Sequence, residues 1–157
     1  MMKILVISTV ITLLLLFGLT LLNVLLQYKN KANAAWTELE NAFIKRRDMV
    51  PLLLESARIE DPRWTVLKDK RGELLNNQIE KNKRLELEKQ FGNAISAFIA
   101  IADGNKDSVF QEAKKDLMKD IHDEINPAMQ KYLDYSEEFN DKLRKFPYII
   151  AAKIFRP

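Results

Sequence analysis

The stretch ANAAWTELENAFIKRRDMVPLLLESA, residues 32–57, decides the fold class of this chain. Apolar residues recur in it every three or four positions, which is the spacing that places them on one face of an α-helix. They are Ala32, Ala35, Trp36, Leu39, Phe43, Val50, Leu53, Leu54 and Ala57. The spacing predicts a long amphipathic helix. Pro51 should kink or break it, because proline lacks the N–H that an interior helical residue donates.

Arg46 and Arg47 stand where this apolar stripe expects another apolar residue. A guanidinium buried in a helical bundle needs a carboxylate or free carbonyl oxygens, so we expect an ion pair between helices. We expect the partner on the last predicted helix, where the candidates are Asp134, Glu137, Glu138 and Asp141. The alternative interpretation is that Arg46, Arg47 and Asp48 bind a phosphate or a lipid headgroup.

Upstream of this helix, Ile4–Leu26 contains no charged residue. As a helix this run would reach about 35 Å, which is enough to cross a hydrocarbon core of ~30 Å. The alternative is a cleaved signal peptide, because Ala32-Asn33-Ala34 is similar to a cleavage site. Against this, the apolar run is longer than a typical signal core, and Lys29 and Lys31 separate it from the candidate site. We therefore predict a retained membrane anchor over residues 1–27 and a helical-bundle domain over residues 28–157.

The balance of basic residues predicts the orientation of the anchor. Lys3 precedes the apolar run, whereas Lys29, Lys31 and Lys45–Arg47 follow it. Basic residues favour the cytoplasmic side of a membrane, so we expect a single-pass protein with a cytoplasmic C-terminal domain.

Downstream, turn signals divide the chain into further helices. Asp61-Pro62 predicts an N-cap followed by a first helical residue, and Asp103-Gly104-Asn105 predicts a turn. Ser108 with Gln111 matches a capping box at the start of the last helix, which Asn126-Pro127 should bend. The polar stretch from Glu80 to Gln90 reads as a solvated face. The fold class predicted is all-α: one transmembrane helix that continues into an antiparallel up-and-down bundle of three to four long helices.

The last helix carries the most regular apolar stripe of the chain. Its members are Phe110, Ala113, Leu117, Ile121, Ile125, Ala128, Tyr132, Tyr135, Phe139, Leu143 and Phe146. Pro147 should end this helix. The apolar tail from Tyr148 to Phe155 is too short to span a bilayer, so we expect it to fold onto the bundle or to lie at the membrane surface.

Composition excludes most catalytic classes. The chain has no Cys and a single His, His122, which argues against a thiolate metal site, a cysteine nucleophile and a histidine-based triad. The positions one turn from His122 hold no usual zinc ligand, so we expect it to face solvent. Basic and acidic residues nearly balance at 25 and 22, which does not favour nucleic-acid binding. We predict no enzymatic activity, no cofactor and no metal.

Several scattered motifs together resemble the bacterial LemA family. They are Tyr28, Ala34-Ala35-Trp36, Lys45-Arg46-Arg47-Asp48-Met49-Val50-Pro51 with Leu53, Glu124-Ile125, Tyr132, Phe139-Asn140 and Phe146-Pro147. The segment from Arg46 to Pro51 is similar to the hallmark segment of that family, with Lys45 in place of its first Arg. The resemblance marks eight residues as family-motif or structural positions: Trp36, Arg46, Arg47, Asp48, Pro51, Asn140, Phe146 and Pro147.

The chain also departs from that family. Leu52 stands where the family usually has Asn, and Ile59-Glu60-Asp61-Pro62 replaces a Gly-Tyr-x-x-His-Glu stretch, so the resemblance is to a divergent, compact member. It implies a bundle anchored in the bacterial cell membrane, without established enzymatic activity. We expect a scaffold or adaptor that contacts the bilayer and binds proteins, including further copies of itself. The alternative is an accessory regulator of a membrane enzyme such as a metalloprotease, and lipid binding near Lys29 and Lys31 is a third possibility.

Overall fold

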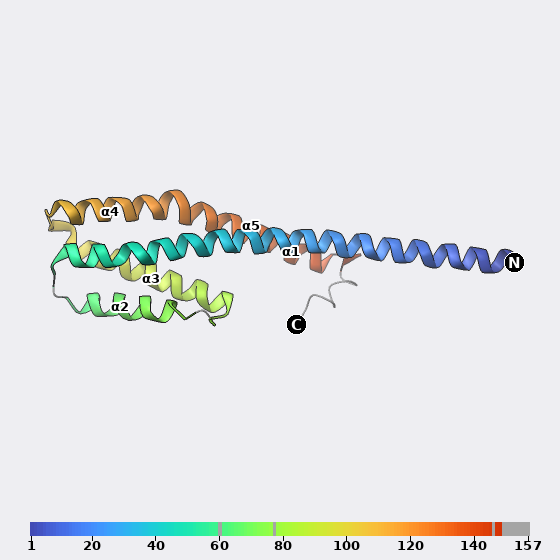
Figure 1. The fold of residues 1–157 in the computed structure, drawn as a ribbon, viewed down its shortest axis with the longest axis horizontal. Coiled ribbons are helices and arrows are strands. Elements are labelled where there is room, and N and C mark those ends of the chain that lie inside the picture. The colour runs from blue at the N-terminus through green and yellow to red at the C-terminus, as the bar shows by residue number, and fades with distance from the viewer. Residues whose placement is uncertain (60, 77, 146, 149–157) are drawn as a thin grey trace. The chain divides into compact units, whose positions relative to one another are not determined.

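The computed structural model describes residues 1–59, 61–76, 78–145 and 147–148, and over these ranges the chain is helical, without a strand (Figure 1). The helices are α1 (Met2–Ala57), α2 (Pro62–Leu74), α3 (Lys81–Ile101), α4 (Ser108–Asp120) and α5 (Asn126–Arg144). A 3₁₀ turn, Ala102–Gly104, follows α3, and a π-helical turn, Ile121–Ile125, joins α4 to α5. This confirms the predicted all-α fold. Apart from Tyr148, the predicted apolar tail lies outside the described residues.

The N-cap of α2 is the predicted one, whereas the N-cap of α4 differs from the prediction. The Asp61 carboxylate accepts a hydrogen bond from the Arg63 N–H at 2.9 Å, so the predicted N-cap is confirmed. At α4 the N-cap is Asp107, whose carboxylate accepts the Val109 N–H at 2.9 Å. Ser108 is already helical, and the predicted capping box is therefore wrong by one residue. Aspartate is as good an N-cap as serine, and it stands one position earlier.

The helix does not break at Pro51, because α1 continues through Pro51 to Ala57, so the break is excluded and the kink stays a prediction. Proline removes the hydrogen bond that the carbonyl of Arg47, four residues earlier, would otherwise accept. Arg71 of α2 replaces it, since its Nε donates to that carbonyl at 2.9 Å. The helix ends at Ala57, and the next residue, Arg58, has a left-handed φ of 51°. Asn105 Nδ2 donates to the Ala57 carbonyl at 2.8 Å.

The helix does not continue regularly up to Asn126-Pro127, where the sequence predicts a bend. The irregularity lies just before these residues, in the π turn, and α5 begins at Asn126. Pro127 lies just after the π turn, and because it lacks an N–H it interrupts the backbone hydrogen bonds of the continuous helix at this point.

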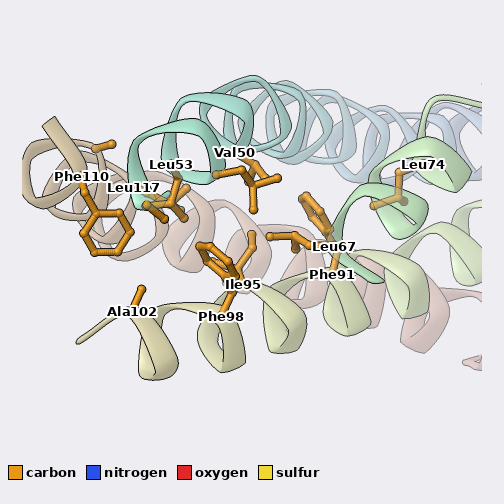
Figure 2. Close-up of a cluster of buried hydrophobic side chains, with 13 residues drawn as sticks. Val50, Leu53, Leu67, Leu74, Phe91, Ile95, Phe98, Ala102, Phe110 and Leu117 are labelled. Carbon is orange, nitrogen blue, oxygen red and sulfur yellow. The ribbon is translucent and has the colours of Figure 1, made fainter. Parts of the chain in front are cut away.

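Two compact units divide the chain, and one of them comprises residues 40–126. Its core gathers buried side chains from α1, α2, α3 and α4, and Figure 2 shows Val50, Phe91 and Phe110 among them. Four phenylalanines are among the largest fully buried side chains of this unit: Phe43, Phe91, Phe98 and Phe110. The predicted stripes thus form the core, in agreement with an antiparallel bundle.

The other unit comprises residues 1–39 and 127–157, of which we describe the part up to 148 without residue 146. Leu25 and Leu143 are buried together, and Phe139 and Tyr148 pack against them. The Trp36 ring meets the edge of Tyr132 with ring centroids 5.2 Å apart. The predicted boundary between residues 27 and 28 falls inside the continuous helix α1, so the division into anchor and bundle domain stays a prediction.

Candidate functional site

Glu88 of α3 binds both of the buried arginines of α1. Arg46 Nη2 donates to a Glu88 carboxylate oxygen and, at 2.9 Å, to the Glu88 carbonyl. Arg47 Nη1 lies 3.2 Å from the other carboxylate oxygen. All three side chains are buried, and Glu88 is only 1% exposed. The predicted ion pair between helices is therefore present.

The predicted location of its partner is wrong. Asp134, Glu137, Glu138 and Asp141 of α5 are all exposed, and the carboxylate that binds Arg46 belongs to the stretch that the sequence assigns to a solvated face. A signal for Glu88 was available. Arg84 and Glu88 continue the three-to-four spacing of the buried residues Phe91, Ile95 and Phe98, which places them on the core face of α3.

Arg47 and Arg84 also bind backbone carbonyls at the end of α2 and just after it, where a carbonyl has no intrahelical donor. Arg47 Nη1 donates to the Leu74 carbonyl at 2.7 Å, and Arg84 Nη2 donates to the Asn76 carbonyl at 2.8 Å. Arg84 Nη1 in addition lies 2.6 Å from a carboxylate oxygen of Glu40. The Arg–Glu network, which we define as Glu40, Arg46, Arg47, Arg84 and Glu88, therefore joins α1, α2 and α3.

Burial is the main electrostatic cost of this network. It lowers the pKa of the Arg46 guanidinium and raises the pKa of the Glu88 carboxyl, because an apolar surrounding disfavours both charged forms. The guanidinium carbon of Arg46 lies 5.1 Å from the Phe43 ring centroid and 5.4 Å from that of Phe91. A Cβ on Gly92 would stand only 3.1 Å from Arg46 Nη1, so the missing side chain lets the guanidinium approach α3. Contacts with Glu88, Phe43 and Phe91 thus fix the position of the Arg46 guanidinium.

A second polar cluster, which the sequence analysis missed, lies where α1 faces α4. Lys45 Nζ lies 2.7 Å from Asp120 Oδ1 and also pairs with Glu124. Asp120 is 4% exposed, and it follows the buried Leu117 by three residues, which is the signal that could have revealed it. Lys45 donates hydrogen bonds to Asp120 and Glu124, and these bonds, first that to Asp120, raise the pKa of Lys45. The bond that Glu124 accepts from Lys45 lowers the pKa of Glu124. A cavity of about 330 Å³ adjoins the cluster and is lined by Lys45, Met49, Asp116, Lys119, Asp120, Asp123 and Glu124.

The remaining motif residues of this unit lie outside the Arg–Glu network. Asp48 is exposed, and its carboxylate is 3.8 Å from Arg71 Nη2. Pro51 is half-buried and lines a groove between α1 and α2. His122 is exposed on the π turn, as predicted.

The motif residues of the other unit do not converge on one site. Trp36 is buried against Tyr132, Asn140 is exposed, and Pro147 is half-buried beyond the end of α5. Phe146 lies outside the described residues. In the described part of the chain, no group of three His, Cys, Asp or Glu side chains is placed to hold a metal ion.

A helical bundle with a buried arginine–carboxylate network, and with one helix apolar and long enough to cross a membrane, defines the class of this protein. The match to known families makes the assignment specific. The LemA family model matches residues 35–157, which is most of the chain, and the protein belongs to the LemA family. No curated protein and no solved structure matches it.

Proposed function

We propose that this protein is a non-enzymatic scaffold or adaptor, anchored in the membrane by the N-terminal part of α1, whose bundle binds other proteins. The apolar part of α1 supports the anchor. An 18-residue window within it has a mean hydropathy of 2.7 and no buried residue, and its large side chains are exposed. Such a surface is stable in hydrocarbon and unfavourable in water.

The observation that carries the binding role is a groove between α1 and α2, with a volume of about 260 Å³. The indole N–H of Trp64 is buried there and has no acceptor among the described residues, and Lys68 Nζ lies 5.0 Å from its ring centroid. A buried donor without an acceptor is unfavourable unless a partner supplies an oxygen. The lining residues are Pro51, Leu54, Glu55, Trp64, Lys68, Arg71 and Gly72, which combine apolar walls with more basic than acidic groups. They suit a protein segment that offers apolar side chains and a carbonyl or carboxylate.

The use of the buried charges also supports a role without catalysis. Arg46 and Arg47 bind Glu88 and backbone carbonyls, so their donors serve contacts between helices. Basic residues after the apolar run favour a cytoplasmic bundle, which protease protection of the bundle in sealed vesicles tests.

The groove is tested by a photo-crosslinking amino acid in place of Glu55, which is exposed and lines it. The matched control carries the same amino acid at Glu112, an exposed glutamate of α4. Both full-length variants are irradiated in native membranes, and the products are identified by mass spectrometry.

We expect cross-links at position 55 that exceed those at position 112. A second copy of the chain as the main product supports a self-assembling scaffold, and another non-enzymatic protein supports an adaptor. A stoichiometric membrane enzyme would favour the alternative function, an accessory regulator of an enzyme such as a metalloprotease. Equal products at both positions would contradict the groove as the binding surface.

A further inference from the structure

The end of α5 packs against the last turn of the apolar run. Leu25 is fully buried by Leu143, Phe139 and Tyr148, although it belongs to the uncharged stretch Ile4–Leu26. Side chains farther toward the N-terminus, from Ile4 to Leu19, remain exposed. The transition from exposed to packed apolar residues on α1 therefore coincides with the end of α5.

Two tyrosines and two lysines meet at this level. Lys31 Nζ lies 5.5 Å from the Tyr28 ring centroid, and Lys142 Nζ lies 5.3 Å from the same centroid. Lys142 Nζ is also 5.6 Å from the ring centroid of Tyr148. Tyrosine rings at the end of an apolar helix are typical of the boundary between hydrocarbon and water, where the ring is apolar and the hydroxyl is hydrated.

The charges around these rings are mainly positive. The segments 27–31 and 141–148 contain the basic residues Lys29, Lys31, Lys142, Arg144 and Lys145, against a single acid, Asp141. Lys31, Arg144 and Lys145 are exposed, and Lys145 Nζ lies 3.2 Å from Asp141, with both side chains more than half exposed. An exposed pair of this kind is weak and is screened by salt, so Lys145 can exchange its partner for another anion.

We propose that Tyr28, Lys31, Lys142, Arg144, Lys145 and Tyr148 form an interfacial collar that binds the headgroups of anionic phospholipids. The inference rests on the membrane anchor of the proposed function and adds a lipid preference to it. The rings hold the lysine side chains at the level where the apolar run ends. Their ammonium groups then lie at the depth of the lipid phosphates, and a surface with net negative charge attracts them.

The test compares the full chain in vesicles of phosphatidylcholine with the chain in vesicles that also contain 30% phosphatidylglycerol, an amount of the order that makes a bilayer surface markedly anionic. Spin-labelled lipids report which headgroup is retained next to the protein. We expect at least about twofold selectivity for spin-labelled phosphatidylglycerol over phosphatidylcholine, and a decrease of this selectivity in high salt.

The collar variant combines Lys31→Gln, Lys142→Gln, Arg144→Gln and Lys145→Gln. The control variant removes four exposed lysines of the other unit, by Lys83→Gln, Lys89→Gln, Lys106→Gln and Lys115→Gln. Both lose the same net charge. We expect selectivity close to one for the collar variant and wild-type selectivity for the control, with unchanged helicity by circular dichroism in both.

Equal loss of selectivity in both variants would overturn the collar, because net charge alone would then explain the attraction. Loss of selectivity on addition of inorganic phosphate at constant ionic strength would overturn lipid as the ligand and indicate a site for free phosphate. A chain that floats with phosphatidylcholine vesicles but shows no selectivity contradicts this inference and leaves the anchor intact. A chain that does not float with any vesicle contradicts the anchor, and the collar with it.

Discussion

Glu88 compensates the charges of two guanidinium groups, those of Arg46 and Arg47, which are buried away from water. Its carboxylate contacts Arg46 and Arg47, and its carbonyl accepts a further bond from Arg46. A buried ion pair contributes little relative to an apolar replacement, but removing one partner leaves a buried charge without compensation. The network therefore specifies which helices pack together more than it adds to the free energy of unfolding.

Glu88→Ala should lower the free energy of unfolding by about 3–5 kcal/mol, because both arginines then remain buried without a carboxylate. The measurement is denaturant unfolding of the full chain in detergent, followed by circular dichroism. Glu86→Ala is the matched control, since Glu86 is an exposed glutamate of the same helix, and it should change stability by less than about 0.5 kcal/mol. Similar losses in the two variants would contradict the structural role of Glu88.

Asp103 provides a pH-dependent contribution. The hydrogen bond from Lys114, at 2.7 Å, holds the pKa of Asp103 below its ordinary value of 3.8. The folded state thus binds the proton less tightly than the unfolded state. The stabilisation is complete above the ordinary pKa and is lost as the pH falls through the lowered one.

Lys114→Gln should therefore reduce the loss of thermal stability between pH 6 and pH 2.5, compared with the wild type. Lys115→Gln removes a neighbouring exposed lysine and serves as the control, which should follow the wild-type pH profile. The observable is the melting temperature at each pH. Parallel profiles for the wild type and Lys114→Gln would show that the pair does not perturb Asp103.

At the scale of the helix, Pro51 creates a binding site for α2. By leaving the Arg47 carbonyl without its intrahelical donor, it makes this oxygen available to Arg71 Nε. Pro51→Ala would supply the missing N–H and restore competition for the carbonyl. The arginine bond should therefore contribute less in that background.

A double-mutant cycle tests this coupling. We expect Arg71→Gln to cost about 0.5–1.5 kcal/mol in the wild type and clearly less in Pro51→Ala, because the carbonyl is then bonded within α1. Denaturant unfolding gives the four free energies. Equal costs in both backgrounds would mean that Arg71 acts through Asp48, which lies 3.8 Å from its Nη2, and not through the carbonyl.

The N-terminus of α4 allows a direct comparison of two neighbouring residues. Asp107→Ala should lower the free energy of unfolding by about 1 kcal/mol, since its carboxylate accepts the N–H groups of Val109 and Phe110. Ser108→Ala should be neutral or slightly stabilising, because Ser108 is exposed and already in the helix, where alanine has the higher propensity. The reverse order of the two losses would restore Ser108 as the N-cap.

Helix existence and most helix boundaries were predictable because their signals are local. Asp61-Pro62 predicts an N-cap and Asp103-Gly104-Asn105 predicts a turn, each from a few neighbouring residues, and the structure has both. The partner of Arg46 was harder to predict. The three-to-four spacing places Glu88 on the core face of α3, but the pairing of Glu88 with Arg46 depends on how α3 packs against α1, which no local signal gives. Lys45 with Asp120 and Glu124 was missed for the same reason, since these residues are distant in sequence.

At the scale of the whole molecule, the question is whether the apolar run is retained or cleaved. Cleavage after Ala34 would remove Leu25 and Ala32, which are both buried, and Tyr28, which lies beside Lys142. It would also cut α1 within a continuous helix, since Met2–Ala57 has no break at this point. A mature chain that started at Ala35 would leave Leu143 without Leu25, its packing partner.

We therefore predict that the protein extracted from native membranes retains the apolar run Ile4–Leu26, which its intact mass and its peptide map show. Replacing Ala32 and Ala34 by Leu removes the small residues that a signal peptidase needs, so it serves as the uncleavable reference. If the anchor is retained, wild type and reference differ only by the mass of the substitutions. A wild-type mass that starts at Ala35, found in the soluble fraction, would contradict the anchor. In that case Leu143 and Phe139, at the end of α5, would have to pack without Leu25, because cleavage removes Leu25.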